Sequence, residues 1–264
     1  MTTPNTKSGW PVRFLALARY SAVAALVLLA IAGPGYRLRL LPLAVAVKGF
    51  FPIGVAAAVA ALVLGGSALL LGSAARRQPH AVGNWLATGF GAAVVLACVH
   101  GYLALRAAPL LHDVSTDTAH PPVFVEAVAL RAADHAENSA DYVRDYTVGE
   151  AVVNAPEVQQ SAYPDLRPLL LKMKPPQAFA AAERTARAMG WRIVAVVPDE
   201  GRIEATATSP YFGFKDDIAI RVRSELNGRG SIVDLRSAAR LGANDAGANA
   251  RHIRDFAERL KQAK

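Results

Sequence analysis

Two kinds of hydrophobic pattern divide this chain. Up to about residue 112, apolar residues form long runs, whereas from residue 113 onward they recur at helix or strand spacing among charged residues. A helix of about 20 apolar residues is long enough to cross the hydrocarbon core of a bilayer. The pattern therefore predicts a membrane domain over residues 1–112 and a separate domain with its own core over residues 113–264.

Three runs in the first part have the length of membrane spans. They cover Phe14 to Ala32, Gly49 to Ser73 and Ala81 to Leu105. The shorter apolar stretch from Leu38 to Val47 contains Pro42, so we expect it to be interfacial or re-entrant. Basic residues precede the first run, and Ala30-Ile31-Ala32 has the form of a cleavage site, so a secretory signal is the alternative interpretation of that run.

Small residues mark one face of the second run. Ala57, Ala61 and Gly65 recur every four residues, which predicts a seam where a neighbouring helix approaches closely. The single cysteine, Cys98, lies within the third run, so neither an intramolecular disulfide nor a multi-cysteine metal site is expected.

Charge is distributed as unevenly as hydropathy. The chain carries a net charge of +8, yet residues 1–112 hold nine Lys and Arg residues and no Asp or Glu, while residues 113–264 hold 20 basic and 21 acidic residues. The basic character therefore belongs to the flanks of the spans. The near-neutral second half lacks the electrostatic footprint of a nucleic-acid-binding domain, so the expected partner is the lipid bilayer and not nucleic acid.

The basic residues also predict an orientation. Five lie in the amino-terminal tail and the second loop (Lys7, Arg13, Arg19, Arg76, Arg77), and four lie on the opposite side (Arg37, Arg39, Lys48, Arg106). Because Lys and Arg favour the cytoplasmic side, the tail is expected inside and the domain after the third span outside. In a bacterial cell, this describes a multi-pass protein of the inner membrane with a periplasmic domain.

The second half predicts an α+β domain. Residues 113–174 show weak periodicity and several prolines, and we interpret them as an irregular arm in which Val123 to Ala133 can form a short helix. Residues 175–264 predict a core in which a helix, a four-stranded antiparallel meander and a second helix follow one another. The expected elements are a helix over Pro175 to Met189, strands over Trp191 to Val197, Arg202 to Thr208, Asp217 to Ser224 and Ser231 to Ala238, and a helix over Asp245 to Gln262.

Strand alternation gives the sheet one apolar and one polar face. The polar face carries Glu204, Thr206, Thr208, Asp217, Arg221, Arg223, Asp234 and Arg236. Two interpretations stay open: a solvated face with cross-strand charge pairs, or a cleft for an anionic or polar ligand that the arm partly covers.

The candidate ligand-binding residues are polar groups on this sheet and on its connection to the last helix. They are Asp216, Asp217, Arg221, Asp234, Arg236, Arg240, Asp245, Asn249 and Arg251. Adjacent carboxylates such as Asp216 and Asp217 bind a hard cation only when they converge, and neighbours in a strand point to opposite faces. The alternative role of these groups is a hydrogen-bonded network that fixes the last helix on the sheet.

No motif indicates a cofactor, a metal or a catalytic group. The spacing of His112, His120 and His135 matches no metal site, and phosphate loops, dinucleotide fingerprints and nucleophile elbows are absent from the sequence.

Several ordered motifs nevertheless carry a resemblance. They are Asp113-Val114-Ser115-Thr116-Asp117, Pro121-Pro122-Val123-Phe124, Tyr163-Pro164-Asp165-Leu166-Arg167-Pro168, Gly190-Trp191-Arg192-Ile193, Ile203-Glu204-Ala205-Thr206, Gly213-Phe214-Lys215-Asp216-Asp217 with Arg221-Val222, and Val233-Asp234-Leu235-Arg236-Ser237 leading to Asn249-Ala250-Arg251. In these motifs the chain resembles the bacterial family of domain of unknown function 1499. The resemblance covers most of residues 113–264 and implies a membrane-associated envelope protein, without an established activity. At Ser237-Ala238-Ala239-Arg240 the chain departs from the family, which tends to keep another hydroxyl before the arginine.

The sequence thus predicts a membrane-anchored binding or scaffold protein of the cell envelope, whose partner is an envelope lipid, a glycan or a protein. The alternative from another class is a membrane-tethered hydrolase that acts on an envelope substrate through Asp216, Asp217 or the polar cluster from Arg236 to Asn249.

Overall fold

The computed structural model describes residues 10–71, 81–225, 228 and 230–262. The chain separates into two compact units. One comprises Met1–Tyr102 with Pro210–Gly213, and the other comprises Leu103–Ser209 with Phe214–Lys264.

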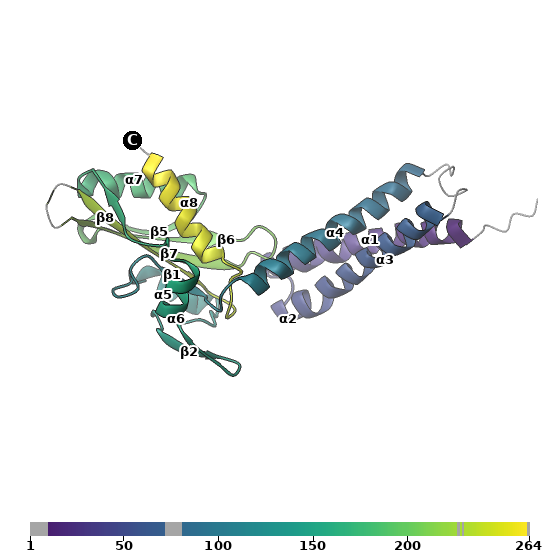
Figure 1. The fold of residues 1–264 in the computed structure, drawn as a ribbon, viewed down its shortest axis with the longest axis horizontal. Coiled ribbons are helices and arrows are strands. Elements are labelled where there is room, and N and C mark those ends of the chain that lie inside the picture. Colours follow the sequence, from purple (N-terminus) through teal and green to yellow (C-terminus); the bar gives the residue numbers. More distant parts are fainter. Residues whose placement is uncertain (1–9, 72–80, 226–227, 229, 263–264) are drawn as a thin grey trace, which may run out of the picture. The chain divides into compact units, whose positions relative to one another are not determined.

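Long apolar helices make up the first unit (Figure 1). They are α1 (Trp10–Arg37), α3 (Phe51–Leu71) and α4 (Ala81–Ala107). The short α2 (Leu43–Val45) and a π-helical turn (Ala46–Phe50) precede α3, and the last residues of α4, from Leu103, belong to the second unit. Among the described residues, three helical segments are long and apolar enough to cross a membrane: Trp10–Arg37, Leu43–Leu70 and Val82–Ala107. Three long apolar helices at the amino-terminal end were expected, and the structure contains them.

The start of the second apolar helix differs from the expectation. The stretch from Leu38 to Val47 is not a separate interfacial segment, because from Leu43 onward it is helical and continuous with α3. Pro42 has φ −61° and stands at the N-cap of this helix. Proline is tolerated there because the first helical N–H groups have no intrahelical acceptor, so it marks the beginning of the helix and does not interrupt it. The end of the expected span at Ser73, and Arg76 and Arg77 of the second loop, lie outside the described residues.

The small-residue seam lies where the helices pack. Ala61 is fully buried and forms a cluster with Ala22 and Ala87. A Cβ at Gly65 would lie 2.1 Å from Thr88 Oγ1, so this position requires glycine. Ala57, however, is only half-buried, and the fully buried residue beside it is Ala58.

The second unit contains a six-stranded antiparallel sheet, where four strands were expected. The expected meander is present as β5 (Arg192–Val197), β6 (Arg202–Thr208), β7 (Lys215–Ser224) and β8 (Ser231–Ala239). The two additional strands, β1 (Asp113–Ser115) and β4 (Leu169–Leu171), both pair with β8, at Arg236–Ala238 and Ser231–Val233 respectively. Three-residue strands carry no readable alternation, and their partner is distant in the sequence.

The arm is also more regular than expected. Its one expected element, a short helix over Val123 to Ala133, is present as α5 (Glu126–Ala133). Besides β1 and β4, the arm also contains a hairpin of β2 (Asp145–Val148) and β3 (Ala151–Asn154), and α6 (Ala155–Ala162). Asn154 caps α6 by accepting a hydrogen bond from the Glu157 N–H at 3.1 Å. The core helices occur as expected, as α7 (Pro175–Ala188) and α8 (Ala248–Gln262).

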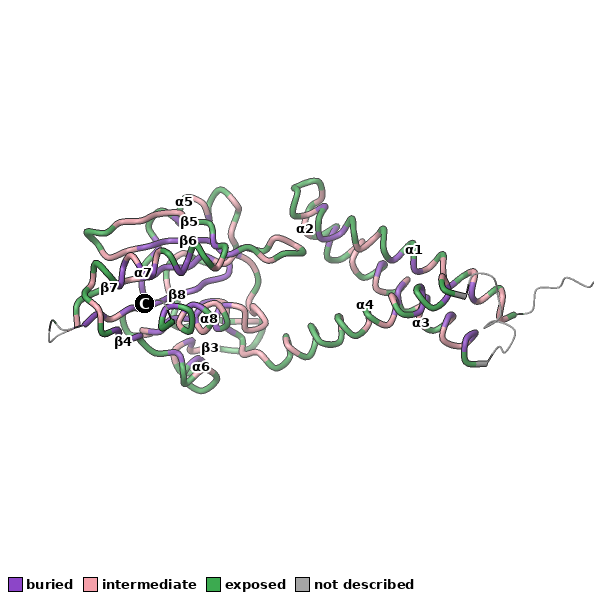
Figure 2. Tube along the Cα trace, turned by 90° about the horizontal axis from the view of Figure 1, so that it is seen from above, coloured by how far each residue is buried: buried purple, intermediate pink, exposed green. Residues whose placement is uncertain are grey.

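Three layers result from this arrangement. Helices α7 and α8 lie on one face of the sheet, and α5, α6 and the hairpin lie on the other side (Figure 1). The core between the sheet and α8 includes Ile220, Leu235, Ile253 and Phe256, all essentially without solvent exposure. Most of β8 is buried (Figure 2), because the arm covers the second face of the sheet as well.

Candidate functional site

A buried ionic network centred on Asp217 occupies the polar face of the sheet. The Asp217 carboxylate accepts hydrogen bonds from Arg131 Nη1 at 2.9 Å, from Arg240 Nε and Nη2 at 2.8 and 2.7 Å, and from Thr206 Oγ1 at 2.8 Å. Asp134 pairs with Arg240 and with Lys215. Arg131 and Asp134 belong to α5 and its end, so this network binds the arm to the sheet.

Arg236 makes a second buried ion pair with the arm. Its guanidinium donates to Asp113 at 2.6 to 3.1 Å and to the carbonyl oxygen of Ala140 at 2.9 Å. The same guanidinium lies 4.6 Å from the centre of the Phe124 ring, a cation–π distance. Arg236 is only 1% exposed, so its charge is compensated inside the protein and is not presented to solvent.

Asp234 and Glu204 also hold the arm. Asp234 accepts from Arg221 at 2.9 Å and from Arg223 at 3.0 Å, and Arg221 extends the contact to Asp117. The Glu204 carboxylate accepts from the N–H groups of Val125, Glu126 and Ala127 and so caps the first turn of α5. Most of the polar face is therefore a buried interface between the sheet and the arm. At its edge, Arg221 and Arg223 stay partly exposed and form cross-strand charge pairs with Asp234.

Asp216 faces the opposite side of the sheet, toward α8. It lies 3.7 Å from His252 Nδ1, and burial raises the pKa of Asp216 from 3.8 to about 7. Burial also lowers the pKa of His252 from 6.5 to about 4, so the pair is predominantly neutral near pH 6. The two adjacent aspartates thus do not converge, as strand geometry requires.

The remaining candidate residues fix α8 at the end of β8. Asp245 accepts from the N–H of Asn249 at 2.7 Å, and Asn249 in turn bonds Ser237 Oγ at 2.6 Å and the His112 carbonyl oxygen at 2.9 Å. Arg251 donates to the Ala246 carbonyl oxygen at 2.8 Å. These contacts have the geometry of the hydrogen-bonded network that was the alternative reading of this cluster.

Ser237, His252 and Asp216 do not have the geometry of a nucleophile with its base. Ser237 Oγ and Asp216 Oδ2 both approach the same ring nitrogen of His252, Nδ1, at 3.4 and 3.7 Å. A relay of the serine-hydrolase type needs the hydroxyl on one ring nitrogen and the carboxylate on the other. Ser237 is moreover completely buried.

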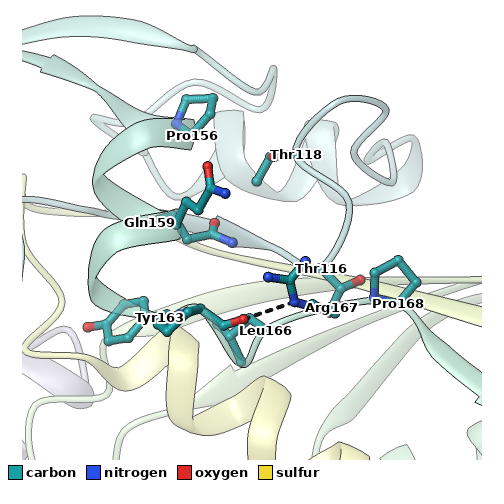
Figure 3. Close-up of a pocket in the computed structure, with 10 residues that line it drawn as sticks. Thr116, Thr118, Pro156, Gln159, Tyr163, Leu166, Arg167 and Pro168 are labelled. Atoms are coloured by element: carbon teal, nitrogen blue, oxygen red, sulfur yellow. Dashed lines mark hydrogen bonds between the residues drawn. The ribbon is translucent and has the colours of Figure 1, made fainter.

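An open polar cleft lies elsewhere, between α6 and two segments of the arm. It has a volume of about 230 Å³ and is lined by Thr116, Thr118, Pro156, Gln159, Gln160, Tyr163, Pro164, Leu166, Arg167 and Pro168. Figure 3 shows the Arg167 guanidinium in the middle of this group, with Gln159 and Thr118 beyond it. Of the ten described residues that line the cleft, none is acidic.

Some of these side chains build the cleft, and others are available to a ligand. The Gln159 amide is fully used, because it donates to the Ser115 carbonyl oxygen at 2.6 Å and accepts from the Ser115 N–H at 3.0 Å. Thr116 Oγ1 likewise accepts from the Leu235 N–H at 2.9 Å. Among the described contacts, the side-chain polar groups of Thr118, Gln160 and Tyr163 have no hydrogen-bond partner.

Sequence reasoning did not place a ligand at these residues. They belong to segments with several prolines and weak periodicity, and none of the nine candidate residues lines the cleft. The one available signal was the segment from Tyr163 to Pro168, which supplied a motif of the family resemblance. A smaller cavity of about 170 Å³ does include one candidate residue, Arg221, beside Pro122, Val125 and Arg202.

No metal centre emerges from the geometry of the described part of the chain. Within residues 10–71, 81–225, 228 and 230–262, no three His, Cys, Asp or Glu side chains lie close enough to hold an ion.

Fold and site together define an α+β domain carried on helices long and apolar enough to span a membrane. Comparison with family models matches residues 113–260 to the family described as "Protein of unknown function (DUF1499)". Because the match covers more than half of the chain, the protein belongs to this family, and the resemblance noted in the sequence motifs is confirmed. Comparison with curated proteins finds no match.

Proposed function

We propose that this protein is a multi-pass protein of the bacterial inner membrane whose DUF1499 domain faces the periplasm. In the cleft beside α6, this domain binds an envelope component, either a lipid headgroup or a glycan. The cleft is the observation that carries the proposal. It is open, it is lined by polar and apolar groups in similar number, and three of its polar side chains have no partner among the described residues. Such a mixture is typical of sites that bind small polar ligands.

The chain connectivity supports a role close to the bilayer. Five residues separate the end of α4 at Ala107 from the start of β1 at Asp113. An extended segment of five residues spans roughly 17 Å at most, so the domain begins within reach of lipid headgroups. The distribution of Lys and Arg around the spans favours the periplasmic side for this domain.

The side of the membrane is tested by protease accessibility of the domain in intact spheroplasts and in lysed ones. We expect the domain to be digested in intact spheroplasts. Digestion only after lysis would place the domain in the cytoplasm and would refute the periplasmic part of the proposal.

Binding is tested by native mass spectrometry of the full-length protein extracted from its own membranes. Wild-type protein is expected to retain an envelope-derived molecule, and Gln160→Trp, which places an indole at the cleft, is expected to lose it. Gln177→Trp on α7 is the matched control, because Gln177 is also exposed and does not line the cleft. Equal retention by both variants would show that the cleft is not the binding site.

The hydrolase alternative receives no support from the geometry. Asp217 is enclosed by two arginines, and Asp216 and Ser237 share one nitrogen of His252. These groups lack the arrangement that proton transfer to a bound substrate needs.

A further inference from the structure

Two arginines at the cleft differ from the arginines on the polar face of the sheet. Arg131, Arg221, Arg223, Arg236 and Arg240 all pair with carboxylates. Arg167, in contrast, is paired only with a backbone carbonyl oxygen: its Nε donates to Pro164 at 3.1 Å. Its two terminal nitrogens, with four N–H groups, have no partner among the described residues and remain available to a ligand.

Arg144 adds a second uncompensated charge at the rim of the cleft. Its Nη1 donates to the carbonyl oxygen of Thr118 at 2.9 Å, and Thr118 lines the cleft. No described carboxylate lies within ion-pair distance of Arg144 or Arg167. Both side chains are exposed, so their charges are solvated by water and an anionic ligand can approach them.

Two of the nearby acidic residues pair with arginines that do not line the cleft. Asp117, which lies between two cleft residues in sequence, turns toward Arg221 at 3.2 Å. Asp165 forms two hydrogen bonds of 2.7 Å with Arg254. The carboxylates of Asp117 and Asp165 are thus balanced by Arg221 and Arg254 and do not offset the charge of Arg167.

The uncharged groups of the cleft suit the same kind of ligand. Burial raises the pKa of Tyr163, so its hydroxyl stays protonated and can donate to an anion. Thr118 and Gln160 can donate or accept, which fits hydroxyl groups on a carrier. A volume of about 230 Å³ is below the roughly 300–1,000 Å³ typical of drug-sized ligands, so a headgroup or a sugar fits and a long acyl chain does not.

We propose that the cleft binds a phosphate group on a small hydroxylated carrier, with Arg167 as its principal ligand and Arg144 at the rim. This proposal rests on the proposed function, because it names the ligand class of the same site. Two guanidinium groups without counter-charges match a phosphate, whose oxygens accept paired N–H groups from arginine, better than they match a neutral glycan. The phosphate comes either from a soluble sugar phosphate or from an anionic lipid headgroup.

The test measures binding by the full-length protein in nanodiscs of phosphatidylcholine. Isothermal titration with glucose 1-phosphate, inorganic phosphate and glucose compares a phosphate ester, the bare anion and a neutral sugar. We expect binding of glucose 1-phosphate, weaker binding of inorganic phosphate, and no binding of glucose. Nanodiscs containing phosphatidylglycerol distinguish the sources: if the lipid headgroup is the ligand, they abolish the binding of added glucose 1-phosphate.

Variants separate a specific site from general attraction to positive charge. Arg167→Gln is expected to weaken glucose 1-phosphate binding at least tenfold, Arg167→Lys less, and Arg144→Gln by a few fold. Arg184→Gln is the matched control, because Arg184 is an exposed arginine on α7 without a described carboxylate partner. Circular dichroism of each variant checks that the fold is intact.

The outcomes distinguish this inference from the broader proposal. Binding of glucose equal to that of glucose 1-phosphate, or an unchanged affinity in Arg167→Gln, would overturn the phosphate assignment. If no phosphate probe binds in phosphatidylcholine while native mass spectrometry still finds a neutral glycan that Gln160→Trp loses, the ligand class is wrong and the proposed function stands. If neither experiment finds a ligand in the cleft, both proposals fail.

Discussion

Replacing Asp217 with Asn tests whether the polar face of the sheet is a structural interface. The substitution keeps the size of the side chain and removes its charge, while Arg131 and Arg240 remain buried at 2% and 3% exposure. Arg240 retains Asp134 as a partner, and Arg131 retains the carbonyl oxygens of Asn138, Ser139 and Ala239 but no carboxylate. The main loss is therefore the charge that compensates Arg131.

The structure gives the magnitude of this loss. Of the four hydrogen bonds that Asp217 accepts, three come from guanidinium groups. An asparagine oxygen can accept about half of them, and its NH₂ group faces the arginines. Hydrogen bonds to charged groups contribute about 1.5–3 kcal/mol each, and removing one partner of a buried ion pair costs about 3–5 kcal/mol. At roughly 2–4 °C per kcal/mol for a domain of this size, Tm falls by roughly 6–20 °C.

Tryptophan fluorescence provides the assay. Trp191 is buried and stacks on Phe256 at a ring distance of 5.7 Å, so its emission reports unfolding of the domain. Replacing Trp10 and Trp85 with Phe in all samples removes the signal of the apolar helices. The control is Asp199→Asn, because Asp199 is exposed, and a change within about 0.5 kcal/mol is expected there. If Asp217→Asn is as stable as Asp199→Asn, the network does not hold the arm and the reasoning is refuted.

Two further predictions concern pH and backbone geometry. In His252→Gln, stability is expected to fall as pH rises from about 4 to about 7, because folded Asp216 then holds a proton that the unfolded chain has released. In Asp216→Asn, stability is expected to rise between about pH 4 and 6.5, because the unfolded chain then binds a proton that folded His252 does not. Urea midpoints at several pH values measure the slope of stability against pH in both variants. Slopes of the same sign would contradict the directions of the two pKa shifts. Gly201→Ala is expected to lower the free energy of unfolding by more than about 2 kcal/mol, because φ is +62° and the new Cβ would lie 2.1 Å from the Val222 carbonyl oxygen. Gly149→Ala is the control, since Gly149 has φ +60° with open space around it, and the expected loss is only about 1 kcal/mol. Equal midpoints of the two variants in chemical unfolding would show that the close contact at Gly201 relaxes.

The long strands and the two core helices were predictable because their signals are local. The expected strand from Arg202 to Thr208 matches β6 residue for residue, since its apolar and polar positions alternate throughout. The helix expected from Pro175 ends one residue earlier than predicted, near Gly190 at φ +73°. The last helix begins at Ala248, because Asp245 caps it from outside.

The burial of the polar face was not predictable from the strands alone. Alternation identifies Asp217, Asp234 and Arg236 as one face, yet whether that face meets water depends on partners far away in the sequence. Asp113 is 123 residues from Arg236, and Arg131 is 86 residues from Asp217. The cleft escaped detection for a similar reason, since its residues come from two separated segments with only weak periodicity.

One feature of the sheet bears on how the domain is made in the cell. β8 pairs with β1, β4 and β7, and it follows all three in the chain. During synthesis, β1 and β4 therefore emerge before their partner and cannot pair until β8 has left the ribosome. Contacts across such large sequence separations slow folding and leave strand edges open to aggregation. Deletion of β8 would leave β1 and β4 without a partner in the sheet and would turn β7, which keeps β6, into an exposed edge strand.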